Sequence, residues 1–298
     1  MKICMIGAGY VGLVSAACFS EFGWHVACVD KDPHRLDELN AGRSPIYEPG
    51  LDDLMQRNMK AGRLTFTASL EDAVKGAAVV FLAVGTPMRR GDGYADLSHV
   101  YGAVEEIAPL LESFAVITTK STVPTGTSRE IERRIAALRP DLEFAICSNP
   151  EFLREGSAIQ DFTHPDRVLV GTDSAKAREV LDRLYAPLNL RGSPVIFVTR
   201  ESAELAKYAA NAFLATKISF INEIADLCEA VGGDVQDVAR GIGLDNRIGP
   251  KFLHAGPGYG GSCFPKDTLA LLQTGQQHGV PMRIVSAVVD VNETRKDS

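Results

Sequence analysis

The chain begins with Met1-Lys2-Ile3-Cys4-Met5-Ile6-Gly7-Ala8-Gly9-Tyr10-Val11-Gly12, and this segment determines the architecture that follows. The short apolar run Lys2–Ile6 predicts a strand, and Val11–Phe22 has the apolar spacing of a helix. The glycines between them follow the pattern G-x-G-x-x-G. The first permits a tight turn, the second lets the backbone approach a pyrophosphate, and the third allows close packing of helix on sheet. A dinucleotide-binding turn is therefore predicted.

An acidic residue follows the second predicted strand at the position that this reading requires. Asp30 comes directly after His25–Val29, where a carboxylate accepts hydrogen bonds from the ribose hydroxyls of the adenosine. A carboxylate there repels a 2′-phosphate, so NAD is favoured over NADP. A glycine turn of purely structural use is the alternative.

The first two-thirds of the chain alternate strand and helix patterns. Such alternation predicts parallel βαβ units and a doubly wound, Rossmann-like α/β sheet with helices on both faces. The predicted strands are Lys2–Ile6, His25–Val29, Val79–Ala83, Phe114–Thr119, Glu143–Cys147, Arg167–Val170 and Val195–Val198. The predicted helices are Val11–Phe22, Pro33–Asn40, Leu97–Leu111 and Gly126–Leu138.

The pattern changes near Arg200. Glu201–Val231 holds no proline or glycine and keeps an apolar stripe at helical spacing, so it predicts one long helix that ends at Gly232-Gly233. Val235–Arg240 and a segment from about Lys266 are further helical patterns. We therefore expect an NAD-binding domain at 1–199 and an all-α central domain at 200–298. A helix of this length is expected to link the domains and to support a homodimer.

The bulk composition is that of a soluble globular protein. The chain has 298 residues, 45% of them hydrophobic, and a net charge of −7, which argues against nonspecific binding to nucleic acid. The apolar runs are too short to cross a bilayer, and the N-terminus predicts a strand instead of a signal peptide. A cytoplasmic location is expected.

The six cysteines show no paired spacing of a zinc site, so no metal is expected. Five of them lie in strand-like or helical patterns, where a buried small apolar side chain is the expected role. These are Cys4, Cys18, Cys28, Cys147 and Cys228.

Cys263 stands apart because it lies in Gly260-Gly261-Ser262-Cys263-Phe264-Pro265-Lys266-Asp267. These residues predict a loop that leads into a helix N-terminus. Backbone dipoles and a nearby lysine stabilise a thiolate there, which is the nucleophilic form. An ordinary loop cysteine is the alternative.

Lys207 and Asn211 are four residues apart on the long predicted helix and therefore share one face. A cation and an amide that project together could stabilise a developing oxyanion. A solvated lysine beside a surface asparagine is the alternative.

Further candidates follow strands, at the edge where open α/β sheets bind ligands. Glu151 and Glu155 belong to Ser148-Asn149-Pro150-Glu151-Phe152-Leu153-Arg154-Glu155, and either carboxylate could orient or deprotonate water. Acids at a helix N-terminus also serve stability alone. Ser121–Thr127 and Thr86-Pro87 are expected at the same edge.

Together these motifs resemble the UDP-glucose/GDP-mannose dehydrogenase family. The resemblance rests on Gly7–Gly12, Ser121–Thr127, Asn149–Glu155, the Lys207/Asn211 pair and Gly258–Asp267, and it runs from Met1 to about Lys296. Arg247–Gly261 is most similar to the branch that acts on UDP-glucose. The family oxidises a sugar 6-hydroxyl to a carboxylate with two NAD molecules. The resemblance implies that Cys263 forms a thiohemiacetal and then a thioester, whose hydrolysis gives UDP-glucuronate.

The resemblance also implies roles for individual residues. Lys207 and Asn211 would stabilise oxyanions, and Asp267 would assist proton transfer with Lys207. Glu151 would activate the hydrolytic water with support from Thr122. Contacts with NAD are implied for Gly7, Gly9, Tyr10, Val11, Gly12, Asp30, Arg35, Thr86, Thr122, Glu155 and Lys266. The sugar-nucleotide pocket is implied for Glu151, Phe152, Leu153, Arg154, Glu155, Lys207, Asn211, Phe252, Leu253, His254, Ala255, Gly256 and Gly260.

Members of the family continue into a C-terminal domain that helps to bind the nucleotide. We expect that UDP-binding domain to be absent from this chain, so that NAD binding survives and full turnover stays open. A role in polysaccharide biosynthesis is expected. Alternatives are the same chemistry on GDP-mannose or an N-acetylated UDP-sugar, a single-step dehydrogenase of the hydroxyacid type, and a non-catalytic NAD-sensing module.

Overall fold

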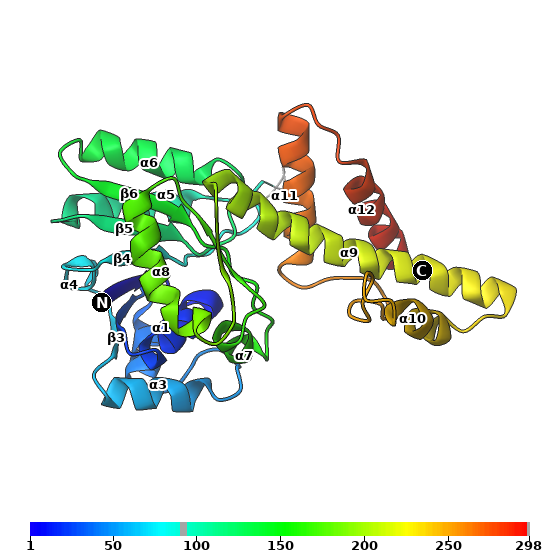
Figure 1. Ribbon diagram of the computed structural model, residues 1–298, viewed down its shortest axis with the longest axis horizontal. Coiled ribbons are helices and arrows are strands. Elements are labelled where there is room, and N and C mark those ends of the chain that lie inside the picture. Colours follow the sequence, from blue (N-terminus) through cyan, green and yellow to red (C-terminus); the bar gives the residue numbers. More distant parts are fainter. Residues whose placement is uncertain (90–93, 297–298) are drawn as a thin grey trace. The chain divides into compact units, whose positions relative to one another are not determined.

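The computed structural model describes residues 1–89 and 94–296 (Figure 1). The chain forms two compact units. The sheet unit comprises Met1–Pro87 and Asp96–Leu205, and the helical unit comprises the described parts of Met88–Ala95 and Ala206–Ser298. Each unit has its own buried apolar residues.

The sheet unit is built on one eight-stranded sheet with the order β3-β2-β1-β4-β5-β6-β7-β8. Its order reverses at β1, because β2 lies on one side of that strand and β4 on the other. The strands are β1 (Lys2–Ile6), β2 (His25–Val29), β3 (Leu64–Thr67), β4 (Val79–Leu82), β5 (Ala115–Thr119), β6 (Phe144–Ser148), β7 (Val168–Gly171) and β8 (Val195–Val198).

All seven predicted strands are present, within one residue at each end, and β3 was missed. Leu64 and Phe66 are buried while Thr65 is exposed, so this four-residue strand alternates at the end of the sheet instead of forming an apolar run. The predicted doubly wound parallel sheet is confirmed, with an exception at one pair of strands. β7 is antiparallel to β6, because the chain re-enters the sheet at the edge where it left, without the crossover that a parallel neighbour requires.

Helices cover both faces of the sheet, as predicted. Ile3 and Met5 of β1 belong to one core with residues of α1, while Cys4 and Ile6 belong to a second core with residues of α5. The helices are α1 (Tyr10–Glu21), α2 (Pro33–Asn40), α3 (Leu51–Lys60), α4 (Leu70–Val74), α5 (Ser98–Ile107), α6 (Thr127–Leu138), α7 (Ala158–Thr163) and α8 (Ala175–Asn189). A short 3-10 turn follows α5 at Ala108–Leu110. The sequence interpretation did not single out α3, α4, α7 or α8.

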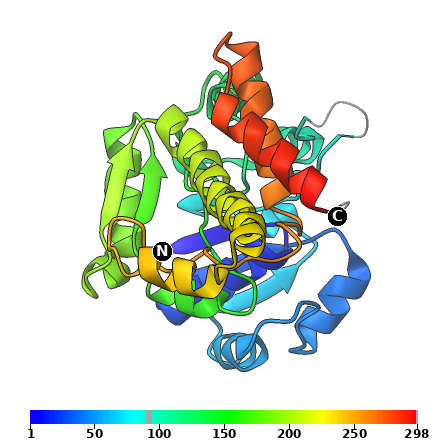
Figure 2. The same cartoon turned by 90° about the vertical axis from the view of Figure 1, so that its right-hand side faces the viewer.

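The helical unit follows the course of α9 (Arg200–Val231), which begins in the sheet unit (Figure 2). The other helices are α10 (Val235–Gly243), α11 (Phe264–Gln277) and α12 (Arg283–Lys296). Three small apolar clusters succeed one another along α9. They are centred on Tyr208 with Leu271, Ala215 with Val288, and Ile221 with Leu253. This confirms the predicted helical region after the Rossmann-like sheet.

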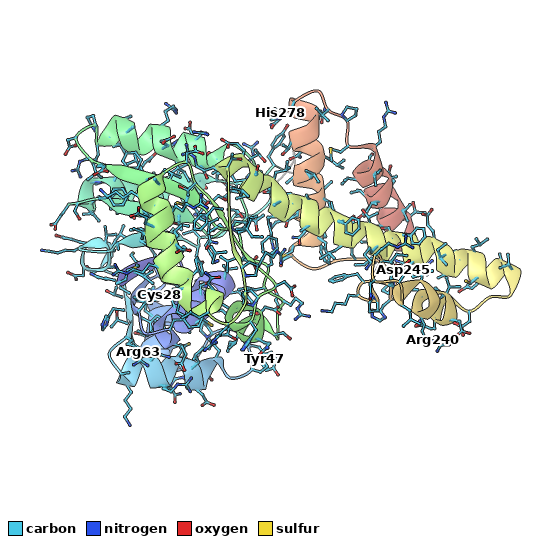
Figure 3. All side chains as sticks on the ribbon, in the orientation of Figure 1. Cys28, Tyr47, Arg63, Arg240, Asp245 and His278 are labelled. Carbon is cyan, nitrogen blue, oxygen red and sulfur yellow. The ribbon has the colours of Figure 1, made fainter. Side chains whose placement is uncertain are left out.

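Figure 3 shows how side chains are distributed within each unit. Cys28 of β2 is fully buried in the sheet unit, whereas Tyr47 of the same unit is exposed. In the helical unit, Arg240 and Asp245 are ion-paired with close neighbours in the sequence. Among the described residues, none of the helices combines the length and the apolar character that a membrane span needs.

The turn between β1 and α1 depends on glycine at two positions. Gly7 has a φ of 101°, and a Cβ atom there would lie 2.7 Å from the carbonyl oxygen of Ala83. A Cβ atom at Gly12 would lie 1.9 Å from the carbonyl oxygen of Gly7. A Cβ atom at Gly9, in contrast, would meet nothing within 4 Å.

Gly12→Ala is therefore expected to destabilise the sheet unit by roughly 2–3 kcal/mol, as overpacking does in a well-packed core. The measurement is urea unfolding followed by the fluorescence of Trp24, the single tryptophan, whose indole N–H donates to the carbonyl of Leu184 at 3.1 Å. Gly9→Ala is the matched control and should stay within about 1 kcal/mol of the wild type. Equal stability of the two variants would contradict the close-packing argument.

Candidate active site

The start of α1 supplies hydrogen-bond donors at the carboxyl edge of the sheet. The N–H of Leu13 donates to the carbonyl of Gly9 at 2.8 Å and opens the helical ladder. The N–H groups of Tyr10, Val11 and Gly12 therefore have no acceptor within the helix. Because a Cβ atom at Gly9 would meet only open space, a phosphate can approach these donors. The turn fits the pyrophosphate of NAD.

Asp30 follows β2 and is held by its own surroundings. Its carboxylate accepts the N–H of Ala8 at 2.8 Å, the N–H of Asp32 at 3.0 Å and the guanidinium of Arg35 at 3.0 Å. Burial raises the pKa of this carboxyl, but the two N–H groups and Arg35 outweigh burial and hold the pKa below its ordinary value. An ionised carboxylate is thus fixed beside the glycine turn, as the sequence predicted for the ribose contact.

Two loops that follow β4 and β5 are tied together at the same edge. The hydroxyl of Thr86 donates to the carbonyl of Thr122 at 2.9 Å. The hydroxyl of Ser121 donates to the carbonyl of Val84 at 2.6 Å. The structure therefore brings Thr86 and Thr122, both predicted to contact NAD, into direct contact.

The loop after β6 carries the predicted carboxylates. Glu151 accepts the N–H of Leu153 at 2.5 Å, and Arg154 pairs with Asp161 at 2.6 Å. The guanidinium carbon of Arg167, the residue before β7, lies 3.7 Å from the centroid of the Phe152 ring. Glu155, which follows Arg154 in this loop, is exposed.

Cys263 lies at the N-cap of α11 in the helical unit, and the N–H of Asp267 donates to its carbonyl at 2.9 Å. Its thiol is exposed and lies 3.6 Å from the hydroxyl of Ser262. The five other cysteines are buried, as predicted. Burial raises the pKa of Cys4 to about 12 and that of Cys147 to about 11.

A buried carboxylate connects α9 with α11. Asp267 has no exposed surface, and its two oxygens accept the side-chain amide of Asn211 at 2.6 Å and the ammonium of Lys266 at 2.5 Å. Lys207 is 5% exposed and lies one turn before Asn211 on the same helix. The structure thus brings Asn211, Lys266 and Asp267 together, next to the cysteine in the sequence.

The segment 252–260, which includes the predicted sugar-nucleotide residues Phe252–Gly256 and Gly260, is held by two buried asparagines. Asn222 of α9 accepts the N–H of Gly256 at 2.8 Å, and Asn292 of α12 accepts the N–H of Tyr259 at 2.7 Å. Phe252 adopts a φ of 64°, a conformation that costs energy for a side chain of this size, and such strain often marks a binding segment. Within this segment Leu253 is buried, His254 and Gly260 are exposed, and Ala255 and Gly256 are half-buried.

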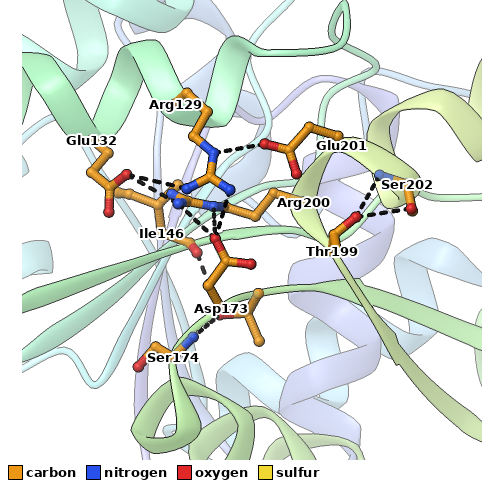
Figure 4. Close-up of polar contacts among 10 residues, drawn as sticks. Arg129, Glu132, Ile146, Asp173, Ser174, Thr199, Arg200, Glu201 and Ser202 are labelled. Atoms are coloured by element: carbon orange, nitrogen blue, oxygen red, sulfur yellow. Dashed lines mark hydrogen bonds and ion pairs between the residues drawn. The ribbon is translucent and has the colours of Figure 1, made fainter.

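An ion-pair cluster at the start of α9 was not predicted (Figure 4). Arg200 is 3% exposed, and its guanidinium lies 2.9 Å from Asp173 and 3.0 Å from Glu132. Arg129 of α6 lies 2.9 Å from Asp173 and 2.6 Å from Glu201. The first turn of the long helix is thereby bound to α6 and to the end of β7.

Glu204 was also missed. It is 2% exposed and accepts the N–H of Gly126 at 2.6 Å and the N–H of Ser128 at 2.8 Å, which caps α6 from α9. Burial raises the pKa of this carboxyl above its ordinary value, although the hydrogen bonds oppose that effect. Its partners lie more than seventy positions away, so no local pattern in the sequence indicates them.

Comparison with known proteins places these features in a family. Residues 1–189 match the model of the UDP-glucose/GDP-mannose dehydrogenase family, NAD binding domain, and residues 201–294 match the central domain of the same family. The chain belongs to the UDP-glucose/GDP-mannose dehydrogenase family. NAD is therefore its cofactor, and the resemblance stated from the motifs is confirmed.

Individual relatives agree with this placement. The chain is 61% identical to a UDP-glucose 6-dehydrogenase of Rhizobium meliloti over 99% of its own length and 68% of the relative's. It is 50% identical to a UDP-glucose 6-dehydrogenase of Pseudomonas aeruginosa, covering 100% of this chain and 66% of the relative. The solved UDP-glucose dehydrogenase of Pyrobaculum islandicum is 42% identical with a TM-score of 0.94, over 98% of this chain and 68% of that one. The chain thus spans about two-thirds of each of these proteins.

No cluster of three or more His, Cys, Asp or Glu side chains that could hold a metal ion occurs in residues 1–89 and 94–296.

The raised pKa of Glu204 gives a pH dependence with a definite sign. Its contribution to stability is fully present below the unfolded pKa near 4.5 and is lost as the pH rises through the folded pKa. The stability of the wild type relative to Glu204→Gln is therefore expected to increase as the pH is lowered from neutral toward 4.5. Urea unfolding of both proteins at several pH values measures this difference.

Glu201→Gln is the matched control one turn earlier on α9. The hydrogen bond from Arg129 holds the pKa of Glu201 below its ordinary value, so the stability that this carboxylate contributes is lost as the pH falls. The difference curve for Glu204 should fall as the pH rises above about 4.5, whereas the curve for Glu201 should stay flat above about 4.5 and fall as the pH is lowered below it. Parallel curves would contradict the assignment for Glu204.

Proposed function

We propose that this protein oxidises UDP-glucose to UDP-glucuronate with NAD, through a covalent intermediate on Cys263. The observation that carries this proposal is the position of Cys263, an exposed thiol at the N-cap of α11, in the same loop and helix as Lys266 and Asp267. The choice of UDP-glucose as the substrate is supported by the relatives at 61% and 50% identity, which are UDP-glucose 6-dehydrogenases.

The balance of the reaction explains why this set of groups is needed. UDP-glucose, two NAD⁺ and one water give UDP-glucuronate, two NADH and three protons. Each bound NAD⁺ accepts one hydride. The chain must therefore remove the proton of the 6-hydroxyl, hold the aldehyde, and activate water for the last step.

The groups in the helical unit suit the first two tasks. The thiolate of Cys263 adds to the C6 aldehyde and forms a carbon–sulfur bond, and the aldehyde oxygen takes up a proton as the thiohemiacetal. Oxidation of that adduct leaves a thioester. Lys207 and Asn211 would stabilise the oxyanions by donating hydrogen bonds to them, and Asp267 holds the Asn211 amide at 2.6 Å. We assign proton transfer to Asp267 together with Lys207.

Hydrolysis is assigned to the sheet unit. Glu151 would accept a proton from the water that attacks the thioester carbon, and Thr122 would hold that water. The carbon–sulfur bond then breaks, Cys263 leaves as a thiolate, and the carboxylate forms. Glu151 lies in a loop at the carboxyl end of β6, where the fold places ligands.

Binding roles complete the proposal. Gly7, Gly9, Tyr10, Val11 and Gly12 would hold the NAD phosphates through N–H groups, and Asp30 and Arg35 would hold the adenosine ribose. Thr86, Thr122, Glu155 and Lys266 would contact the rest of the cofactor. The sugar nucleotide would contact Glu151–Glu155, Lys207, Asn211, Phe252–Gly256 and Gly260.

Three further properties belong to this proposal. The enzyme works in the cytoplasm, and its product enters polysaccharide biosynthesis, because an activated uronic acid is a building block for such polymers.

It acts as a homodimer through α9. Support for the dimer comes from Phe213, Phe220 and Leu227, which recur every seven residues along α9 and are 66%, 49% and 56% exposed.

Cys263→Ser is expected to lower the rate of acid formation by several orders of magnitude, because a serine alkoxide is a much poorer leaving group than a cysteine thiolate. The assay is the production of NADH and UDP-glucuronate by the full-length protein, with intact-mass spectrometry of the protein during turnover. Wild type should yield two NADH for each UDP-glucose and carry a transient acyl adduct. Cys228→Ser is the control at a buried cysteine and should retain turnover. A wild-type rate in Cys263→Ser would refute the mechanism.

A panel of sugar nucleotides that includes GDP-mannose tests the choice of UDP-glucose as the substrate.

Phe220→Asp is expected to shift the dimer toward monomer by at least tenfold in the dissociation constant, because it places a charge in the apolar face of α9. Analytical ultracentrifugation measures the change. Leu190→Asp is the control, since Leu190 is an 89% exposed apolar residue that follows α8 in the sheet unit. A dimer that tolerates both substitutions equally would exclude this face of α9.

A further inference from the structure

Glu48 is a buried carboxylate that neither the motifs nor the proposed chemistry uses. It lies in the segment between α2 and α3 and is 7% exposed. One carboxylate oxygen accepts the hydroxyl of Tyr10 and the N–H of Gly156, the latter at 2.9 Å. The other accepts the N–H of Ile159 at 3.4 Å. The side chain thus joins three segments that are far apart in the sequence.

Tyr10 closes the same cluster from the glycine turn. It is the first residue of α1, and its hydroxyl oxygen accepts the N–H of Gly156 at 3.1 Å while its O–H donates to Glu48. Burial raises the pKa of Tyr10, and the hydrogen bond to Glu48 raises it further, so the phenol stays protonated and remains a donor. A buried carboxylate is costly unless donors satisfy it, and here a hydroxyl and two N–H groups do so.

The base of this cluster is fixed. The carbonyl of Glu48 accepts the N–H of Leu51 at 3.1 Å, at the start of α3, and residues of α3 and α1 share one apolar core. The position of Glu48 therefore follows from packed helices. Glu48 holds the loop between β6 and α7, which has no helical or strand hydrogen bonding of its own.

That loop carries Glu155 between two anchored residues. On one side the N–H of Arg154 donates to Asp161 at 2.8 Å, and on the other Gly156 donates to Glu48 and Tyr10. With both neighbours held, the backbone of Glu155 has little freedom. Its side chain is exposed and is therefore available to a ligand.

We propose that Glu48 is a positioning residue that, through Gly156 and Tyr10, fixes the Glu155 loop against the start of α1 and thereby sets the affinity for NAD. The inference rests on the proposed function for one point, the contact of Glu155 with the cofactor. Glu48 itself touches neither cofactor nor substrate. It acts by removing the freedom of the loop before the ligand arrives, which lowers the entropy lost on binding.

Glu48→Gln is the first test, because the amide keeps the shape but replaces one acceptor oxygen with an NH2 donor. That NH2 must face either the O–H of Tyr10 and the N–H of Gly156 or the N–H of Ile159, and the remaining oxygen, without its charge, is a weaker acceptor. We expect faster exchange of the Gly156 and Ile159 amide protons in the ligand-free chain, by at least tenfold. We expect the dissociation constant for NAD, measured by calorimetry, to rise at least fivefold. Glu38→Gln, at an exposed carboxylate of α2 that pairs with Arg43, is the control and should change neither quantity.

A double-mutant cycle separates positioning from general damage to the fold. Glu155→Ala should weaken NAD binding by itself, and Glu48→Gln should weaken it no further in that background, since the loop then has no contact left to position. Full additivity of the two losses, or an unchanged NAD affinity in Glu48→Gln, would overturn the inference. If Glu48→Gln does not fold, Tyr10→Phe removes the hydroxyl alone and is judged by the same cycle.

The outcome is independent of catalysis. A wild-type protein that binds NAD but fails to form UDP-glucuronate would refute the proposed function and leave the binding cycle interpretable. A wild-type enzyme that forms the acid, combined with additive losses in the cycle, would refute the role of Glu48 alone.

Discussion

The carbonyl oxygen of Gly7 occupies the space where a side chain at position 12 would begin, 1.9 Å from the site of a Cβ atom. This contact lets α1 start directly against β1 and leaves its first N–H groups at the carboxyl edge of the sheet. The strand order arranges along the same edge four groups that follow the neighbouring strands: Asp30, Thr86, Thr122 and Glu151. The position of the groups proposed to contact NAD is therefore a consequence of how closely α1 approaches the turn at Gly7.

Buried carboxylates hold the segments that would do the chemistry. Asp267 binds an amide of α9 and an ammonium of α11, Glu204 caps α6, and Glu48 holds the loop before α7. A carboxyl group away from water is stable only while its hydrogen-bond donors remain in place. Each of these three groups therefore makes the structure around it specific, because a displaced loop would leave a buried acceptor without partners.

The sequence predicted many elements whose pattern is local, although the local helices α3 and α8 were not singled out, and it missed the contacts that depend on distant partners. The glycine turn, the long helix α9 and the cysteine loop at the start of α11 each have a pattern that spans a few residues. β3 has none, because Leu64 and Phe66 alternate with threonines in a strand of four residues. Glu48 and Gly156 are 108 positions apart, so only the folded chain shows that they meet. The site residues proposed for both units come from motifs, whereas the residues that hold their loops and helices in place were not predicted.

The distribution of cysteines has a consequence for how the protein responds to oxidants. Peroxides and alkylating reagents attack cysteine thiolates that solvent can reach, and five of the six cysteines are buried. Damage should therefore concentrate at residue 263, the site of the proposed covalent step, before it disturbs the fold. The same selectivity makes that sulfur a single attachment point for a reporter group, without any need to remove the others.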